Sequence, residues 1–580
     1  MSDRASDVVR VLATLWPWPT AANADLDAAL AYLGSDADAS TLERAGRVVA
    51  TAVGGVTVAL GVAVTVVTTV RWGVVTLAVG TMLAVGCLLA TDRGPRLMAR
   101  LARTRALGSA ASLIGRAAMR LRLDPTVERA AAFAARTGRG SLARSLGTHV
   151  ERARGTPRSG FDGFAAEWAD QFPALVRAVS RLDAAASAPA AERDRHLDRA
   201  VTAALEGAQE ELAAFTTEIR GPVTGLYAFA VLLPLALVGI LPAARATGAR
   251  ISLPVVVVLY DVLLPVVVIG TGAWLLARRP VAFPPPRIGA AHPDTPDGYT
   301  GALLAGVAAG AAAGILAART VAPWAAPVAA VGIGPGTALV LQFHAATGVR
   351  ERVLAVENDL HDALYLVGRR VASGEAVEGA IDDAADRVAG ATGALLDDAA
   401  SRQRRLGTTV TAAFRGDGGP LAALPSSRAE GMAALFGLAA TEGEPAGDAL
   451  IATAEHVEEL RRVERESRRE LRRVTDTLSN TAAVFAPLVG GATVALSARV
   501  AGTGTGTGTG TGFGAEPLPT AALGIAVGAY VLWLAAALTV LSTGLTRGLD
   551  RTLVGYRVGA ALCLATVAYL TAYVGAGLFL

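Results

Sequence analysis

The chain has 580 residues, 52% of them hydrophobic, and a mean hydropathy of +0.45, which excludes an ordinary soluble protein. Its formal net charge of +3 rests on arginine alone, because the sequence contains no lysine. A Walker A loop and a Schiff-base enzyme both need a lysine, so both classes are excluded. The two cysteines lie inside apolar runs, and the six histidines form no pair four residues apart. We therefore expect neither a metal site nor a cofactor.

A polar leader, residues 1–47, precedes the first apolar run, so we do not expect a cleavable signal peptide. The apolar runs are about 20 residues long, the length that crosses a bilayer. Arg71-Trp72-Gly73 is expected to form the tight turn between the first two. The runs predict about nine transmembrane helices, at residues 48–70, 73–91, 222–243, 253–277, 301–318, 322–343, 481–499, 519–542 and 553–579.

Two polar, alanine-rich segments with helical periodicity lie between the apolar runs. They are residues 92–221, the first helical block, and residues 344–480, the second helical block. Each runs into an apolar span without a break, near Pro222 in the first case and Pro487 in the second. The predicted fold is an all-α polytopic membrane protein with two helical-bundle domains arranged as an internal duplication.

The other segments complete two similar halves. Arginine clusters directly after spans are typical of the cytoplasmic side. They place the N-terminus and both helical blocks in the cytoplasm and the C-terminus outside the cell membrane. In chain order, the predicted segments are a hairpin at 48–91, the first block, a span pair at 222–277, a Pro-rich cytoplasmic linker at 278–300, a hairpin at 301–343, the second block, and three spans in 481–579 with an external Gly/Thr-repeat loop at 501–512.

A short pattern occurs twice in the second helical block. Gly374-Glu375 is followed by Ala380-Ile381, and Gly443-Glu444 is followed by Ala449-Leu450. In a helical hairpin, the glycine would close one helix and the acidic residue would begin the next. An ordinary helix turn and a partner-contact site are the two interpretations of this pattern.

The helix that leaves the second block carries arginines interleaved with acidic residues. Glu464 and Arg468 have the spacing of an ion pair on an exposed helix. Contact with anionic lipid or with a partner ATPase is the alternative. Nucleic acid is not expected, because acids are interleaved and aromatic residues are missing. The candidate partner-contact residues in this run are Arg461, Arg465, Arg468 and Arg472.

The two helical blocks differ in charge. Residues 92–221 contain 21 Arg and 15 acidic residues, a net charge of +6. Residues 348–480 contain 17 Arg and 23 acidic residues, a net charge of −6. Either both blocks are ordinary solvated surfaces, or they attract each other or present opposite faces to a partner.

The helix turns of the form G-E-x-x-x-x-A-[IL], the two helical blocks and a proline-bearing span after each block resemble the type II secretion F family. The closer resemblance is to its archaeal members, which are assembly platforms for type IV pili and archaella. It covers about residues 92–545; the final span, the Gly/Thr loop and a degenerate turn in the first block depart from the pattern.

The resemblance implies a non-enzymatic inner-membrane platform. Its cytoplasmic blocks would dock on a secretion ATPase, and its spans would guide pilin-like subunits into a filament or secretion system. A homo-oligomer is compatible with this interpretation.

One acidic residue, Asp261, lies deep in an apolar span and is a candidate functional group for that reason. Either it has a structural partner in the bundle, or it takes part in subunit passage. Pro222 and Pro487 are expected to kink their spans, with simple packing tolerance as the alternative. A transporter built from parallel repeats is the second hypothesis, but it would need polar residues converging at the midplane. No span carries paired carboxylates, a Ser/His pair or an HExxH motif, so no catalytic residue is expected.

Overall fold

A computed structural model shows that the chain is built from helices, and no strand occurs in the part that it describes. Eight of these helices are long and apolar enough to cross a membrane. The chain is therefore an all-α polytopic protein, as predicted. The predicted span at residues 222–243 is not among these eight. It lies partly outside the described residues, as do the Pro-rich linker and the Gly/Thr loop. The structure describes residues 3–579 except 21–22, 36, 68–69, 139, 157–158, 235, 238–239, 241–252, 280–297, 444 and 504–518.

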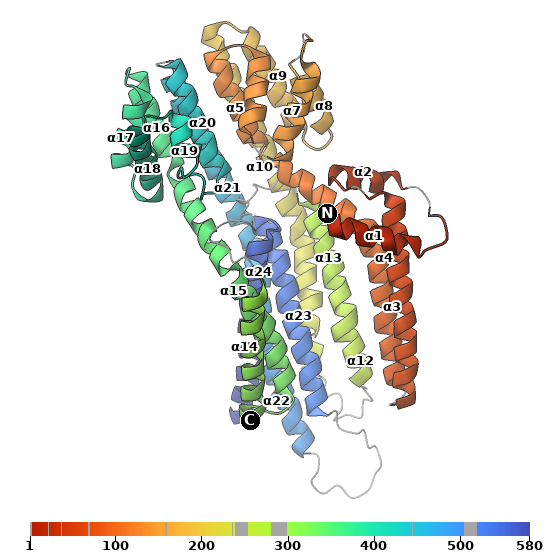
Figure 1. The fold of residues 1–580 in the computed structure, drawn as a ribbon. Coiled ribbons are helices and arrows are strands. Elements are labelled where there is room, and N and C mark those ends of the chain that lie inside the picture. The colour runs from red at the N-terminus through yellow and green to blue at the C-terminus, as the bar shows by residue number, and fades with distance from the viewer. Residues whose placement is uncertain are drawn as a thin grey trace, which may run out of the picture.

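The long helices run side by side, with the two helical blocks at one end (Figure 1). α23 lies at the centre of the bundle. In its most apolar stretch, 61% of the residues are buried, against 11% in that of α3. The helices with candidate spans are α3 (Ala39–Val67), α4 (Val70–Leu107), α12 (Leu253–Val257) with η2 (Val258–Leu263) and α13 (Leu264–Arg278), α14 (Thr300–Thr320), α15 (Ala325–Asn358), α21 (Pro445–Asn480) with η3 (Thr481–Phe485) and α22 (Ala486–Thr503), α23 (Thr520–Arg547) and α24 (Arg551–Phe579).

The turn of the first hairpin differs from the prediction. Arg71-Trp72-Gly73 lies inside α4, which begins at Val70, so the prediction of a turn there is wrong. A Cβ on Gly73 would lie 3.0 Å from the carbonyl oxygen of Gly61 on α3. The glycine therefore serves the close packing of two helices, a common use of small residues in membranes.

Glycines also bring α14 against α15. Gly306, Gly310 and Gly314 recur every four residues and form a stripe along α14. A Cβ on Gly310 would lie 2.9 Å from the carbonyl oxygen of Ala330 and 3.0 Å from the Cα of Gly334. No side chain fits there, so the backbones themselves are in contact.

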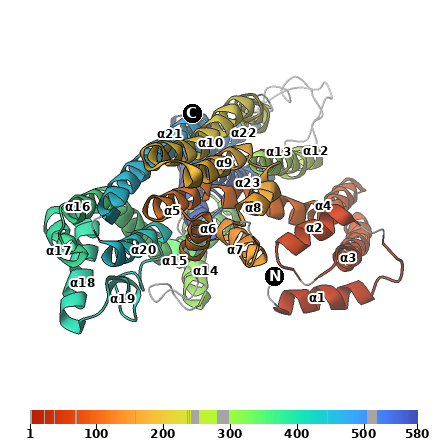
Figure 2. The same cartoon turned by 90° about the horizontal axis from the view of Figure 1, so that it is seen from above.

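Each helical block has its own apolar core. Aromatic side chains such as Phe161, Phe164 and Phe172 fill the first, and Phe414 and Phe436 lie in the second. Seen from above, the second block lies on one side of the first, and the α3–α4 hairpin lies on the other (Figure 2). The remaining helices are α1 (Asp3–Thr14), α2 (Ala24–Tyr32), α5 (Ala110–Leu123), α6 (Val127–Thr137), α7 (Ser141–Ala153), α8 (Phe161–Trp168), α9 (Pro173–Ser187), α10 (Ala190–Tyr227), α16 (Leu360–Ala372), α17 (Val377–Arg387), α18 (Gly390–Leu406), α19 (Val410–Arg415) and α20 (Ser427–Glu442).

Both blocks continue into the apolar region through unbroken helices, as the sequence predicts. α10 leaves the first block and passes directly into η1 (Ala228–Leu232). α21 leaves the second block and passes through η3 into α22. Neither junction contains a loop in the residues that the structure describes.

Candidate functional site

Two buried carboxylates from different helices meet at one arginine within the second block. Glu357, near the end of α15, and Glu464, in α21, are each 6% exposed. Arg428, in the first turn of α20, donates to Glu357 Oε2 at 3.2 Å and to Glu464 Oε2 at 2.7 Å. Ser426, the N-cap of α20, donates its hydroxyl to Glu357 at 2.7 Å. Arg468 pairs with the second oxygen of Glu464, and these five residues form what we call the charge network.

The charge network joins helices with different roles. α15 contains an apolar span and α21 runs through η3 into one, whereas α20 lies wholly within the second block. Burial lowers the pKa of Arg428, but the carboxylates of Glu464 and Glu357 outweigh burial and raise that pKa above its usual value. The guanidinium therefore stays charged. Because removing one partner of a buried ion pair costs about 3–5 kcal/mol, each member holds the others in place.

The two predicted glycine turns lie at the same end of the second block. Gly374 has φ +87° between α16 and α17, and Gly443 has φ +73° between α20 and α21. A Cβ on Gly447 would lie 2.3 Å from the backbone nitrogen of Ala372, so the start of α21 touches the end of α16. Left-handed backbone at both turns explains the glycines on local grounds.

Of the two acidic residues in these turns, only Glu375 belongs to the described part of the chain. Glu375 pairs with Arg370 at 3.5 Å, so its charge is partly used within its own hairpin. Glu444 lies outside the described residues. Ala380 and Ile381, like Ala449 and Leu450, are buried, so the apolar half of the pattern faces the core.

The predicted arginine run divides into two kinds of residue. Arg461 donates to Asn358 Oδ1 at 2.5 Å, and Arg468 belongs to the charge network, so both are structural contacts. Arg465 is exposed and donates only to the carbonyl of Arg461, at 3.3 Å. Arg472 is also exposed. The four arginines do not form one surface.

The two helical blocks contact each other along α5 and α10 on one side and α20 and α21 on the other. Arg120 of α5 pairs with Glu442 at the end of α20 at 2.7 Å. Arg116 donates to a backbone carbonyl at the start of α20 at 3.2 Å. His456 of α21 lies 3.7 Å from the carboxylate of Asp198 on α10. Arg116 and Arg120 thus bring positive charge of the first block to oxygen atoms of the second, which fits attraction between the blocks. The His456–Asp198 contact has the opposite arrangement, because its acidic side chain belongs to the first block.

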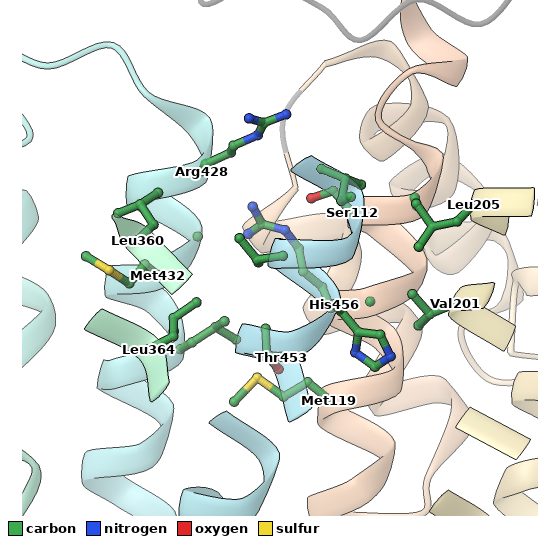
Figure 3. A pocket seen from close by; sticks show the side chains of 17 residues that line it. Ser112, Met119, Val201, Leu205, Leu360, Leu364, Arg428, Met432, Thr453 and His456 are labelled. Carbon is green, nitrogen blue, oxygen red and sulfur yellow. The ribbon is translucent and has the colours of Figure 1, made fainter. Parts of the chain in front are cut away.

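A cavity of about 90 Å³ lies within this contact. Leu360, Leu364 and Met432 line it from the second block, and Val201 and Leu205 line it from α10 (Figure 3). Its walls are mostly apolar. It therefore marks a place where the two blocks are not packed to the usual density of a protein interior.

Three π-helical segments interrupt long helices in the described residues, and each ends two residues before a proline. Leu232 ends η1 before Pro234, Leu263 ends η2 before Pro265, and Phe485 ends η3 before Pro487. Proline has no N–H and crowds the carbonyl four residues earlier, and a π turn widens the helix where that hydrogen bond is lost.

The predicted Pro487 therefore follows a local irregularity. In the first half of the chain, the matching proline is Pro234. Pro222 lies inside α10, which stays α-helical as far as Tyr227. A kink at Pro222 remains a prediction.

Asp261 lies in η2, four residues before Pro265, so its backbone carbonyl loses the usual donor. The neighbouring Tyr260 donates its hydroxyl to the carbonyl of Pro234 at 2.6 Å. Its ring also meets the ring of Tyr530 on α23 edge-on, at 5.4 Å. The carboxylate of Asp261 forms no ion pair within the described chain. Tyr530 lies within electrostatic reach of this carboxylate, and both interpretations of Asp261, a structural partner and a role in subunit passage, stay predictions.

No three or more His, Cys, Asp or Glu residues in the described segments are grouped so that they could hold a metal ion. No protein-family model matches the chain, and comparisons with curated proteins and with solved structures give no significant match. The geometry of the chain itself therefore carries the functional argument.

Proposed function

We propose that the chain is a non-enzymatic membrane platform that couples a cytoplasmic secretion ATPase to the assembly of pilin-like subunits into a type IV pilus-like filament or secretion system. The observation that carries the proposal is the pair of unbroken helices that join the blocks to the apolar bundle. A platform has to pass a displacement from a motor to the membrane. A continuous helix does this more directly than a loop.

The π segments support the proposed duplication. In both halves, a helix leaves a block, widens into a π turn and reaches a proline two residues later, at Pro234 and at Pro487. The first half has a second such segment before Pro265, which α23 lacks. The two halves would therefore have similar motions but different stiffness at their second spans.

The glycine turns of the second block are the proposed docking end. Two exposed acids lie in the first turns of the helices that follow them, Glu378 in α17 and Asp448 in α21. The termini lie toward opposite ends of the long helices (Figure 1), which fits a cytoplasmic N-terminus and an external C-terminus. In this orientation, both blocks face the ATPase.

Co-purification from gently solubilised membranes tests the proposal. The tagged full-length chain should retain a secretion ATPase, and the double variant Glu378→Arg with Asp448→Arg should recover much less of it. The matched control is Asp162→Arg with Glu192→Arg, which reverses two exposed acids in helix first turns of the first block. If the unchanged protein retains no ATPase, the platform function is refuted.

Asp261 is the observation that favours the alternative, a parallel-repeat transporter. A carboxylate and a freed carbonyl lie together inside a span beside Tyr530, which belongs to the other half of the chain. In that case a solute should stabilise the purified protein, and the Asp261→Asn variant should lose the stabilisation.

A further inference from the structure

Five arginines from four helices lie together at the end of the apolar bundle nearest the second block. They are Arg350 of α15, Arg468 and Arg472 of α21, Arg547 of α23 and Arg557 of α24, and we call them the arginine cluster. Arg547 lies within electrostatic reach of the other four, and Arg557 lies within reach of Arg472 and Arg350. The four helices also pack on one another in several pairs.

The acidic residues at the arginine cluster do not balance its charge. Asp550 binds Arg350 at 2.9 Å through one oxygen, and its other oxygen accepts from Thr552. Glu464 holds Arg468 but is shared with Arg428. The one further acid within reach of Arg557 is Asp476, which is exposed. An excess of positive charge remains.

Several donors of the cluster have no protein acceptor. Within the described chain, Arg472, Arg547 and Arg557 form no hydrogen bond or ion pair. The side chain of Arg350 is only 5% exposed, and its Nε is buried without a hydrogen-bond partner. Buried polar groups are almost always satisfied, so Nε of Arg350 lacks an expected acceptor, whereas Arg472 is exposed and Arg547 and Arg557 are half-buried. This buried donor and the excess of positive charge together point to a ligand that accepts hydrogen bonds and carries negative charge.

The position of the cluster narrows the class of ligand. Arg547 is the last residue of the candidate span in α23, and the candidate span of α24 begins at Arg551. Arg472 lies nine residues, about two and a half turns, before the π segment that opens the apolar part of α21–α22. The cluster thus lies at one end of the candidate spans, where headgroups would meet the bundle if these helices cross a bilayer. Guanidinium groups bind phosphate through paired hydrogen bonds.

We propose that the arginine cluster binds a phosphate group, supplied by the headgroup of an anionic lipid. The bound phosphate offsets the mutual repulsion of the arginines and accepts their unused N–H groups. It also joins the base of α21 to the α23–α24 turn, because the cluster includes residues from both. The site is separate from the proposed docking end and does not depend on the proposed function.

The test uses the full-length protein in nanodiscs of phosphatidylcholine with and without phosphatidylglycerol. For the unchanged protein, phosphatidylglycerol should raise the unfolding temperature by about 3 °C. The double variant Arg547→Gln with Arg557→Gln should lose this rise. It should also be more stable than the unchanged protein in phosphatidylcholine alone, because like-charge repulsion has been removed.

The control is Arg144→Gln with Arg177→Gln, which removes two charges from exposed positions in the first block and should keep the rise. A separate arm in detergent adds inorganic phosphate against chloride at equal ionic strength. If inorganic phosphate alone reproduces the stabilisation, the site takes a free anion and the lipid source is refuted. If the double variant keeps the full response to phosphatidylglycerol, the site itself is refuted.

Discussion

Replacing Arg428 with methionine is the most direct test of how α20 is held to α15 and α21, the helices that lead from the second block to the apolar spans. The substitution keeps a long, flexible side chain but leaves Glu357 with its hydroxyl donor alone and Glu464 with Arg468 alone. Both carboxylate side chains are 8% exposed, whereas that of Arg428 is 26% exposed. Breaking a buried ion pair costs about 3–5 kcal/mol, and the partial exposure of Arg428 places the expected loss near the lower limit, about 3 kcal/mol.

Hydrogen–deuterium exchange measures this loss locally in the full-length protein. Since about 1.4 kcal/mol corresponds to a factor of ten, the amides of α20 should exchange about a hundredfold faster in the Arg428→Met variant. The control is Arg462→Met on α21, whose ion pair with Glu459 is exposed at the surface. That control should change the free energy of opening by no more than about 0.5 kcal/mol.

A second variant separates charge from packing. When Glu357→Gln and Glu464→Gln are combined with Arg428→Met, no uncompensated buried carboxylate remains at this contact, so most of the protection should return. Equal exchange of α20 in the Arg428→Met and Arg462→Met variants would show that the charge network does not hold the block in place.

Three further perturbations test other features of the structure. Burial, reinforced by two nearby carboxylates, raises the pKa of Asp183 to about 6. The folded state therefore binds this proton more tightly than the unfolded state does. The contribution of Asp183 to stability falls as the pH rises from about 4 to 6. Asp183→Asn should therefore raise the unfolding temperature at pH 7 and leave it almost unchanged at pH 4; an equal shift at both values would contradict the assignment. Gly310→Leu should prevent the close approach of α14 to α15 and reduce the yield of monodisperse protein, whereas Gly301→Leu on the same helix, where a Cβ has open space, should not. Gly374→Ala, at φ +87°, should lower the free energy of unfolding by about 1 kcal/mol. Gly348→Ala inside α15, where a Cβ has open space, should raise it by a similar amount. Loss of stability in both variants would refute the backbone argument.

Hydropathy and periodicity were enough to predict the helical membrane fold, because lipid-crossing segments need long apolar runs. They misplaced the first turn, since an arginine and a tryptophan beside Gly73 interrupt an apolar run equally well inside a helix near the interface. The glycine turns were found because φ > 0 selects glycine locally. Features that are set by residues close in the sequence, such as apolar helices and glycine turns, can thus be predicted from the sequence.

The charge network could not be predicted in the same way. Arg428 is 71 residues from Glu357 and 36 from Glu464, and nothing local distinguishes these three from the other charged residues around them. Only the packing of α15, α20 and α21 brings them together. The prolines are close in sequence to the π segments, yet the sequence predicts only one of the two positions. Pro487 and Pro234 both follow π segments, but in the first half Pro222 lies nearer to the end of the block and is the proline that the sequence favours.

Arg468 belongs to both the charge network and the arginine cluster, and this shared residue links the two. Its guanidinium is bound by Glu464 on one side and lies within electrostatic reach of Arg350 and Arg547 on the other. Charge on the cluster therefore weakens the net attraction that holds Arg468, while a bound anion would strengthen it. The contact between α20 and α21 and the charge state of the arginine cluster are thus coupled through one side chain. α21 runs without a break from the second block through η3 into α22, so Arg468 lies on the helix that would carry a displacement of the block to the apolar bundle.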